Sequence, residues 1–167
     1  MQQEEQQKIF QNILEQHKGI LFKVARTYCR DEEDRQDLIQ EIMIQIWQSL
    51  HKYNDKFQIT TWLYRISLNV AISHYRKRKV RKDKFITLKE NFTQISAADS
   101  SEKEQLLLQL ERFISELKEM DKALVLLYLE NKNYNEISEI LGITVSNVST
   151  KVGRIKEKLK RRFTQNK

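Results

Sequence analysis

Apolar side chains recur every three to four residues along the first half of the chain, which is the spacing of amphipathic helices. One apolar stripe runs through residues 9–28 and a second through residues 38–50. A third begins near Thr60, which is a predicted N-cap because its hydroxyl oxygen can accept a backbone N–H, and continues to a basic stretch after Tyr75. Three helices with such stripes are predicted to bury one common core.

The helical period then lapses for about 20 residues, which is too long for a connection inside a compact domain. Residues 81–103 are therefore predicted to form a flexible linker. Helical order resumes where Ser101 and Glu104 have the spacing of a capping box. The pattern as a whole predicts an all-α fold of two small helical domains, residues 1–80 and residues 104–167.

The second domain carries the pattern of a helix-turn-helix. N-caps are predicted at Asp121, at Asn133 (with Glu136 at capping-box spacing) and at Thr144. Between the last two helices, Gly142 lies where a helix ends in the left-handed conformation that glycine adopts most readily. A short helix, a glycine-containing turn and a longer helix predict a helix-turn-helix as the C-terminal element.

The last predicted helix has a polar face opposite its apolar one. Five side chains on that face suit nucleic-acid contacts: Asn147, Lys151, Arg154, Lys158 and Arg161. Ser149 and Thr150 flank it near the start of the helix. In a recognition helix the N-terminal residues reach base edges, and later Lys and Arg side chains meet phosphates. Arg154 is the candidate for a bidentate contact to guanine. A solvated charged face on an ordinary amphipathic helix is the alternative interpretation.

The third helix of the first domain ends in a dense basic run, from Arg76 to Lys82, that follows a series of aromatic side chains. The aromatic residues are Tyr53, Phe57, Trp62, Tyr64 and Tyr75. Rings beside a basic groove suit single-stranded nucleic acid, because every base has a face to stack on and every phosphate needs a counter-charge. A core position for Trp62 is the alternative to a role in base stacking.

Charge alternates in blocks along the chain. The formal charge of +7 is the sum of −3 over residues 1–50, +8 over 51–90, −4 over 91–130 and +6 over 131–167. Each predicted domain therefore has its own positive segment, as expected for binding to a polyanion, either nucleic acid or an acidic membrane. No apolar run reaches the roughly 18 residues of a membrane span, and residues 1–8 lack the apolar core of a signal peptide. These features predict a cytoplasmic protein without stable membrane insertion.

The composition excludes several other classes. The chain has no proline, three glycines and one cysteine, which excludes turn-rich β folds, internal disulfides and zinc clusters built on cysteine. His17, His51, His74 and Cys29 show no metal-ligand spacing, and no glycine-rich phosphate loop or nucleophile motif occurs. The sequence therefore predicts no enzymatic activity and no cofactor. Two functional classes are considered as alternatives to the one that the motifs below imply. One is a self-sufficient helix-turn-helix regulator, and the other is a nucleic-acid-processing enzyme.

Two motifs, in order, carry a family resemblance. The first is spread over Asp37-Leu38-Ile39-Gln40-Glu41, Trp47, Tyr53 through Phe57, Thr61 through Ile66, and Asn69. The second comprises Tyr134-Asn135-Glu136-Ile137, Leu141-Gly142-Ile143 and Val148. They resemble regions two and four of bacterial RNA polymerase sigma factors, and the presence of these two regions alone, joined by a linker, is similar to the extracytoplasmic-function group. Ser73 and Ser149 depart from the group, where an acidic and a basic residue, respectively, are frequent.

The resemblance implies a subunit that binds core polymerase, recognises promoter DNA and initiates transcription. It implies that the clamp helices of the β′ subunit bind Asp37, Gln40 and Glu41, with the β flap as a second polymerase contact. The minus-ten DNA residues that it implies are Tyr53, Asn54, Lys56, Phe57, Trp62, Arg65, Asn69, Arg76 and Lys77. The minus-thirty-five residues are Asn147, Ser149, Thr150, Lys151, Arg154 and Lys158. An anti-sigma factor is a further partner that the group commonly has.

Overall fold

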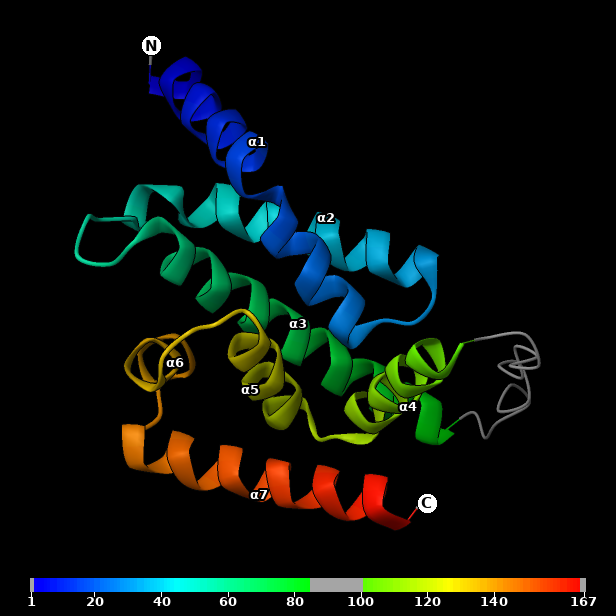
Figure 1. The fold of residues 1–167 in the computed structure, drawn as a ribbon. Coiled ribbons are helices and arrows are strands. Elements are labelled where there is room, and N and C mark those ends of the chain that lie inside the picture. The colour runs from blue at the N-terminus through cyan, green and yellow to red at the C-terminus, as the bar shows by residue number, and fades with distance from the viewer. Residues whose placement is uncertain (1, 85–100, 166–167) are drawn as a thin grey trace.

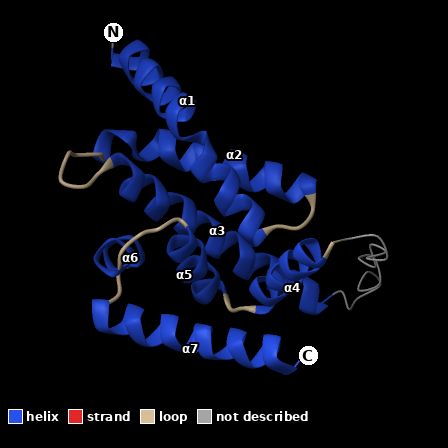
Figure 2. Ribbon diagram, in the orientation of Figure 1, coloured by secondary structure: helices blue, strands red, loops and turns tan. Residues whose placement is uncertain are grey.

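The computed structural model describes residues 2–84 and 101–165, and in them the chain forms helices and loops without a strand (Figure 1; Figure 2). This confirms the all-α prediction. The elements, in order, are α1 (Gln2–Tyr28), α2 (Glu32–Ser49), the short 3₁₀ helix η1 (Leu50–Lys52), α3 (Ile59–Lys84), α4 (Glu102–Glu116), α5 (Glu119–Leu129), α6 (Tyr134–Leu141) and α7 (Val145–Gln165). None of the helices within these residues combines the length and hydropathy that a membrane span requires.

The N-terminal domain consists of α1, α2 and α3, which pack pairwise around one core (Figure 1). The apolar stripes predicted from the sequence face this core. Its fully buried side chains include Val24, Leu38, Ile42, Ile46, Leu63 and Leu68. In Figure 1, α3 runs from the loop after η1 between α1 and α2 on one side and the C-terminal helices on the other.

The prediction that Thr60 caps the third helix is wrong. The first hydrogen bond of α3 runs from the Trp62 N–H to the Gln58 carbonyl oxygen, at 3.2 Å. Thr60 therefore lies inside the first turn of the helix, so it is not the residue that precedes the helix and caps it. The choice of Thr60 rested on residue type, whereas the backbone conformation of the preceding loop decides where the helix starts.

Four local signals in the C-terminal domain are confirmed. The Ser101 Oγ accepts the Glu104 N–H at 3.3 Å, and the Asn133 Oδ1 accepts the Glu136 N–H at 2.8 Å. The Thr144 Oγ1 accepts the Asn147 N–H at 3.0 Å, and Gly142 ends α6 with a φ of 69°. Each signal acts within four residues, which explains why the sequence alone reveals it.

The predicted cap at Asp121 is wrong. Helix α5 begins at Glu119, with Lys118 at its N-cap and no side-chain cap hydrogen bond. Glu119 and Asp121 both lie in the first turn, where negative charge is favourable against the helix dipole. The helix therefore starts two residues before Asp121, and its N-cap is three residues before it.

Helices α3 and α4 both extend into the segment that the sequence predicts as a linker. Helix α3 continues to Lys84 and α4 begins at Glu102, so both ends of the predicted linker, residues 81–103, are helical. The remainder of that prediction, residues 85–100, lies outside the described residues. The last turns of α3 are almost entirely charged, so the apolar period stops well before the helix does.

The two domains pack against each other. Helix α5 contacts both α1 and α3, and α6 contacts α3. In Figure 1 the C-terminal helices lie against one flank of α3, with α7 outermost. The sequence does not specify this placement, because nothing in a linker reveals which faces meet.

One buried polar group in the N-terminal core leads to a stability prediction. The Ser67 side chain on α3 is fully buried, and its Oγ has no hydrogen-bond partner among the described residues. Burying an unpaired hydroxyl group costs about 1 to 3 kcal/mol, so Ser67→Ala is expected to raise the free energy of unfolding by about 1 kcal/mol. Urea titration should show a higher midpoint with an unchanged slope.

The control for this prediction is Ser73→Ala, because Ser73 is exposed on the same helix. Ser73→Ala is expected to raise the free energy of unfolding only through the higher helix propensity of alanine, by about 0.5 kcal/mol. An equal gain from both variants, or a loss from Ser67→Ala, would show that the Ser67 hydroxyl is well paired in solution.

Candidate nucleic-acid interface

The outer face of α2 presents the first set of predicted site residues. Asp37, Gln40 and Glu41 are all exposed and lie within about one helical turn, while Leu38, Ile42 and Ile46 of α2 are buried in the core. The Glu41 Oε2 lies 3.4 Å from the His74 Nδ1 on α3. Ile44 continues the same face and is 56% exposed, and the sequence analysis did not single it out. The α2 outer face therefore combines acidic and amide groups with one exposed aliphatic side chain.

The loop between η1 and α3 folds back onto the start of α3 through aromatic contacts. The ring centroids of Tyr53 and Trp62 are 5.1 Å apart, and the Arg65 guanidinium lies 5.4 Å from the centroid of the Phe57 ring. The Tyr53 hydroxyl donates a long hydrogen bond, 3.4 Å, to the Phe57 carbonyl oxygen. The Asn54 Oδ1 accepts the Lys56 N–H at 3.1 Å, which closes the turn between the two aromatic residues. These contacts bring all the predicted loop residues to one end of α3.

Trp62 has the core contacts of the alternative considered from the sequence, and its role in base stacking stays a prediction. It is partly buried and packs against the core, and it also contacts Tyr53 in the loop. Arg65 and Asn69 follow it at helical spacing and are exposed. Trp62, Arg65, Asn69 and Arg76 thus form a row along one side of α3, because these spacings keep to one face of a helix.

The basic run at the end of α3 is less free than its sequence suggests. The Arg76 Nε lies 2.9 Å from the Glu119 Oε1 on α5, and the Arg78 guanidinium is paired with Asp34 on α2. Lys77 is exposed, as predicted. The Arg76 guanidinium holds the pKa of the Glu119 carboxyl below its usual value. One arginine of the run therefore stabilises the N-terminal domain, and another contacts the C-terminal domain.

The helix-turn-helix is formed by α6 and α7. The turn is held by Gly142 and by the Ser138 hydroxyl, which donates to the Ile143 carbonyl oxygen at 2.5 Å. On α7, Val148 and Val152 face the domain core, while Asn147, Ser149, Thr150, Arg154 and Lys158 are exposed and Lys151 is half-buried. The Thr150 hydroxyl donates to the Ser146 carbonyl oxygen at 3.0 Å within its own helix. All the predicted readers of the minus-thirty-five element except Lys151 are therefore exposed on α7, which is the outermost helix in Figure 1.

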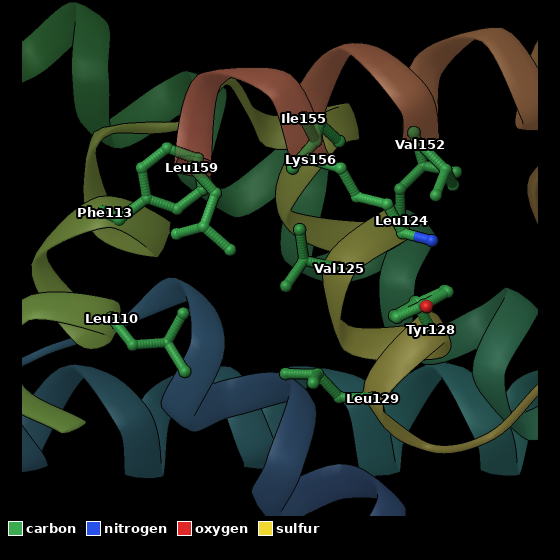
Figure 3. Close-up of a pocket in the computed structure, with 10 residues that line it drawn as sticks. All are labelled: Leu110, Phe113, Leu124, Val125, Tyr128, Leu129, Val152, Ile155, Lys156 and Leu159. Carbon is green, nitrogen blue, oxygen red and sulfur yellow. The ribbon is translucent and has the colours of Figure 1, made fainter. Parts of the chain in front are cut away.

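An apolar cavity of about 100 Å³ lies between α4, α5 and α7 (Figure 3). Its lining residues are Leu110, Phe113, Leu124, Val125, Tyr128, Leu129, Val152, Ile155, Lys156 and Leu159. Lys156 places its Nζ 4.7 Å from the centroid of the Tyr128 ring at the rim, and the Tyr128 hydroxyl raises the pKa of this lysine. Periodicity could not reveal the cavity, because it depends on how three helices meet.

Metal ligands do not gather in the part of the chain that the structure describes. There, no group of three or more His, Cys, Asp or Glu side chains has the arrangement of a metal site. The arrangement on α2, α3 and α7 instead offers exposed donors, aromatic faces and positive charge, which are groups that bind protein and nucleic acid.

Comparison with known proteins accounts for both domains. The family model for sigma-70 region 2 matches residues 13–81, and the model for sigma-70 region 4 matches residues 107–159. The chain belongs to the sigma-70 family. Region 2 therefore contains the α2 outer face, the loop and most of α3, and region 4 contains the helix-turn-helix.

Full-length relatives place this sigma factor in the extracytoplasmic-function (ECF) group. It is 28% identical to the RNA polymerase sigma factor CnrH of Cupriavidus metallidurans, over 92% of this chain and 85% of the relative. It is 29% identical to the ECF sigma factor SigW of Bacillus subtilis, over 94% and 90%. The solved structure of RpoE from Bartonella quintana, in complex with the anti-sigma factor NepR, superposes with a TM-score of 0.72 at 17% identity, covering 96% of this chain and 99% of that one, and supports the fold. The function of this sigma factor is to initiate transcription with RNA polymerase.

Proposed function

We propose that this sigma factor binds core polymerase through the α2 outer face, with Asp37, Gln40 and Glu41 against the clamp helices of the β′ subunit. The polar groups of this face are exposed and lie off the core stripe, so a partner can bury them without disturbing the fold. Ile44 adds a central apolar contact to the same face. Apolar anchors surrounded by polar groups are typical of specific protein interfaces.

The loop and the exposed row on α3 are proposed to capture the minus-ten element. Tyr53, Phe57 and Trp62 supply aromatic faces for an unstacked base, with Asn54 and Lys56 in the turn between the first two. Flipping a base out of the duplex costs a few kcal/mol, and stacking on an aromatic ring returns about 1 to 3 kcal/mol per base. Phosphate contacts from the α3 row, its Arg65 and Asn69 above all, then hold the separated strand.

The exposed side of α7 is proposed to read the minus-thirty-five duplex in the major groove. Arg154 is exposed and can donate two parallel hydrogen bonds to guanine, while Asn147, Ser149 and Lys151 lie nearer the start of the helix. Lys158, one turn further along, is placed for phosphate contact. Thr150 keeps its hydroxyl on its own helix, so its methyl group is the part that faces a base.

Two protein partners are proposed in addition to the β′ clamp. The apolar cavity of region 4 supports the flap of the β subunit as a second polymerase contact, because a short apolar segment could fill it. The RpoE structure contains an anti-sigma factor, which supports such a regulator for this chain as well. We further propose that the chain acts in the cytoplasm as a non-catalytic subunit, so that binding energy alone separates the DNA strands.

The observation that carries the proposal is the exposed row on α3 together with the outward side of α7, within a chain that both family models match. The test is to mix the purified chain with core polymerase and a promoter library and to map the reactivity of thymines to permanganate. Sequence-specific melting upstream of a start site is the expected result. If no native promoter melts, the proposal fails, and tight binding to a palindromic duplex without polymerase would favour a self-sufficient regulator instead.

A further inference from the structure

We propose that docking of the C-terminal domain blocks part of the minus-ten surface, because Glu119 takes the place of a DNA phosphate on Arg76. The inference rests on the proposed function, since it requires Arg76 to contact DNA. It adds that the docked arrangement of the two domains and the binding of DNA by region 2 compete for one guanidinium group.

The carboxylate of Glu119 is held in place by the fold. Glu119 is the first residue of α5, and its own carbonyl oxygen accepts a 2.6 Å hydrogen bond from the Tyr28 hydroxyl at the end of α1. From there its Oε1 lies 2.9 Å from the Arg76 Nε. The Glu119 side chain is 23% exposed, whereas that of Arg76 is 63% exposed. The Glu119 carboxylate is therefore part of a packed contact, whereas Arg76 is solvent-exposed apart from the Nε–H that Glu119 accepts.

One turn along α5, a buried lysine extends the same contact. Lys122 is 4% exposed and is the one charged residue buried among those that the structure describes. Its Nζ lies 4.4 Å from the centroid of the Tyr75 ring and 5.9 Å from that of Tyr28. Burial lowers the pKa of Lys122. Two tyrosines of the N-terminal domain thus hold the segment that presents Glu119.

Further contacts join the domains away from the DNA residues. Lys23 on α1 pairs with Glu130 at 2.7 Å, and the Arg30 Nη2 lies 2.5 Å from the Ser115 Oγ. Lys132 lies 5.6 Å from the centroid of the Tyr64 ring, and burial raises the pKa of Tyr64 to about 12. The docking is therefore distributed over both ends of α5, and the Glu119–Arg76 pair is one of several contacts.

Carboxylate and phosphate oxygens accept the same N–H groups of arginine, so they compete for it directly. A phosphate that approaches Arg76 in the docked arrangement meets the negative charge of Glu119, and it gains the Nε–H of Arg76 only by displacing this carboxylate. By linkage, any ligand that needs the free guanidinium weakens the docking, and docking weakens that ligand by the same factor. Other ion pairs between the domains, such as Lys23 with Glu130, do not compete with DNA, because they involve none of the proposed DNA-binding residues.

The test measures binding of the full-length chain to a short fluorescein-labelled single-stranded DNA of mixed sequence, by anisotropy at low salt. Glu119→Gln is expected to bind about threefold more tightly than the wild type, a gain typical of releasing an exposed ion pair. Adding Arg76→Gln to that variant should abolish the gain. Circular dichroism verifies that each variant keeps its helices.

The matched control is Glu130→Gln, which removes the same charge and breaks an ion pair between the same domains. Its affinity for the oligonucleotide should stay close to that of the wild type. An equal gain in DNA affinity from Glu130→Gln would assign the effect to net charge or to weaker packing between the domains. No gain in DNA affinity from Glu119→Gln would show that the Glu119 carboxylate and the DNA do not compete for Arg76. Either result overturns the inference.

Promoter melting by holoenzyme separates this inference from the proposed function. If wild-type holoenzyme melts promoters and Glu119→Gln leaves oligonucleotide affinity unchanged, only the competition at Arg76 is overturned. If wild-type holoenzyme melts no promoter, the proposed function itself fails.

Discussion

Reversing two charges on the α2 outer face, as Asp37→Lys together with Glu41→Lys, is expected to lower the affinity for core RNA polymerase by at least about 100-fold. Both side chains are exposed and share one face of α2 with Gln40. Like charges forced together in an interface cost several kcal/mol, and each 1.4 kcal/mol is about tenfold in affinity. Transcription from any promoter should fall in proportion, because the chain acts only within holoenzyme.

The measurement is a competition assay in which the variant displaces labelled wild-type chain from core polymerase. The fold should survive, since neither side chain is buried and the ion pair that Glu41 makes with His74 on α3 is itself exposed on the Glu41 side. The matched control is Glu15→Lys with Glu111→Lys, which makes the same change in net charge at exposed positions on α1 and α4. Comparable displacement by both double variants would show that α2 is not the binding face.

Replacing Arg154 by alanine is expected to reduce transcription from a promoter with guanine in its minus-thirty-five element by about 10- to 100-fold. A bidentate contact from arginine to guanine contributes about 1 to 3 kcal/mol of discrimination. Arg154 is exposed on the outward side of α7, and the helix beneath it is anchored by the buried Val152 and Ile155. The loss should therefore come from recognition and leave the thermal stability of the domain unchanged.

The experiment compares holoenzymes on promoters that differ at single positions of the minus-thirty-five element. For Arg154→Ala the ranking of promoters should flatten at one position. Arg161→Ala is the control, because Arg161 lies two turns further along the same side of α7, where phosphate contact is expected. That variant should weaken all promoters by a similar small factor. A uniform loss from Arg154→Ala would remove this residue from the base readers.

The local signals of the sequence were reliable where a single turn decides the outcome. Ser101, Asn133 and Thr144 cap their helices because each side chain needs to reach a backbone N–H only three residues ahead. Thr60 and Asp121 failed in the same role. Both have suitable side chains, but the helix start depends on the path of the preceding loop, which residue type does not encode.

The sequence predicts which faces of the helices are exposed better than it predicts which side chains contact one another. The polar residues of α2 and α7 lie on outward faces, as helical spacing predicts. Ile44 was missed, although helical spacing places it with Gln40 and Glu41 and off the buried stripe, where a single exposed isoleucine on a polar face is the signal. The sequence overestimates how many basic side chains at the end of α3 are free to bind a partner, since Arg76 and Arg78 both pair with acidic residues on other helices.

Helix positions, polar faces and the turn at Gly142 follow from interactions within about one or two turns of the chain, so they can be read directly from its order of residues. The pairing of Arg76 with Glu119, the burial of Lys122 between two tyrosines and the apolar cavity of region 4 depend on tertiary packing. These contacts join residues that are far apart in sequence, and each forms only because two particular helix faces meet. Local periodicity holds no information on which faces meet, so that choice belongs to the packing of the two domains.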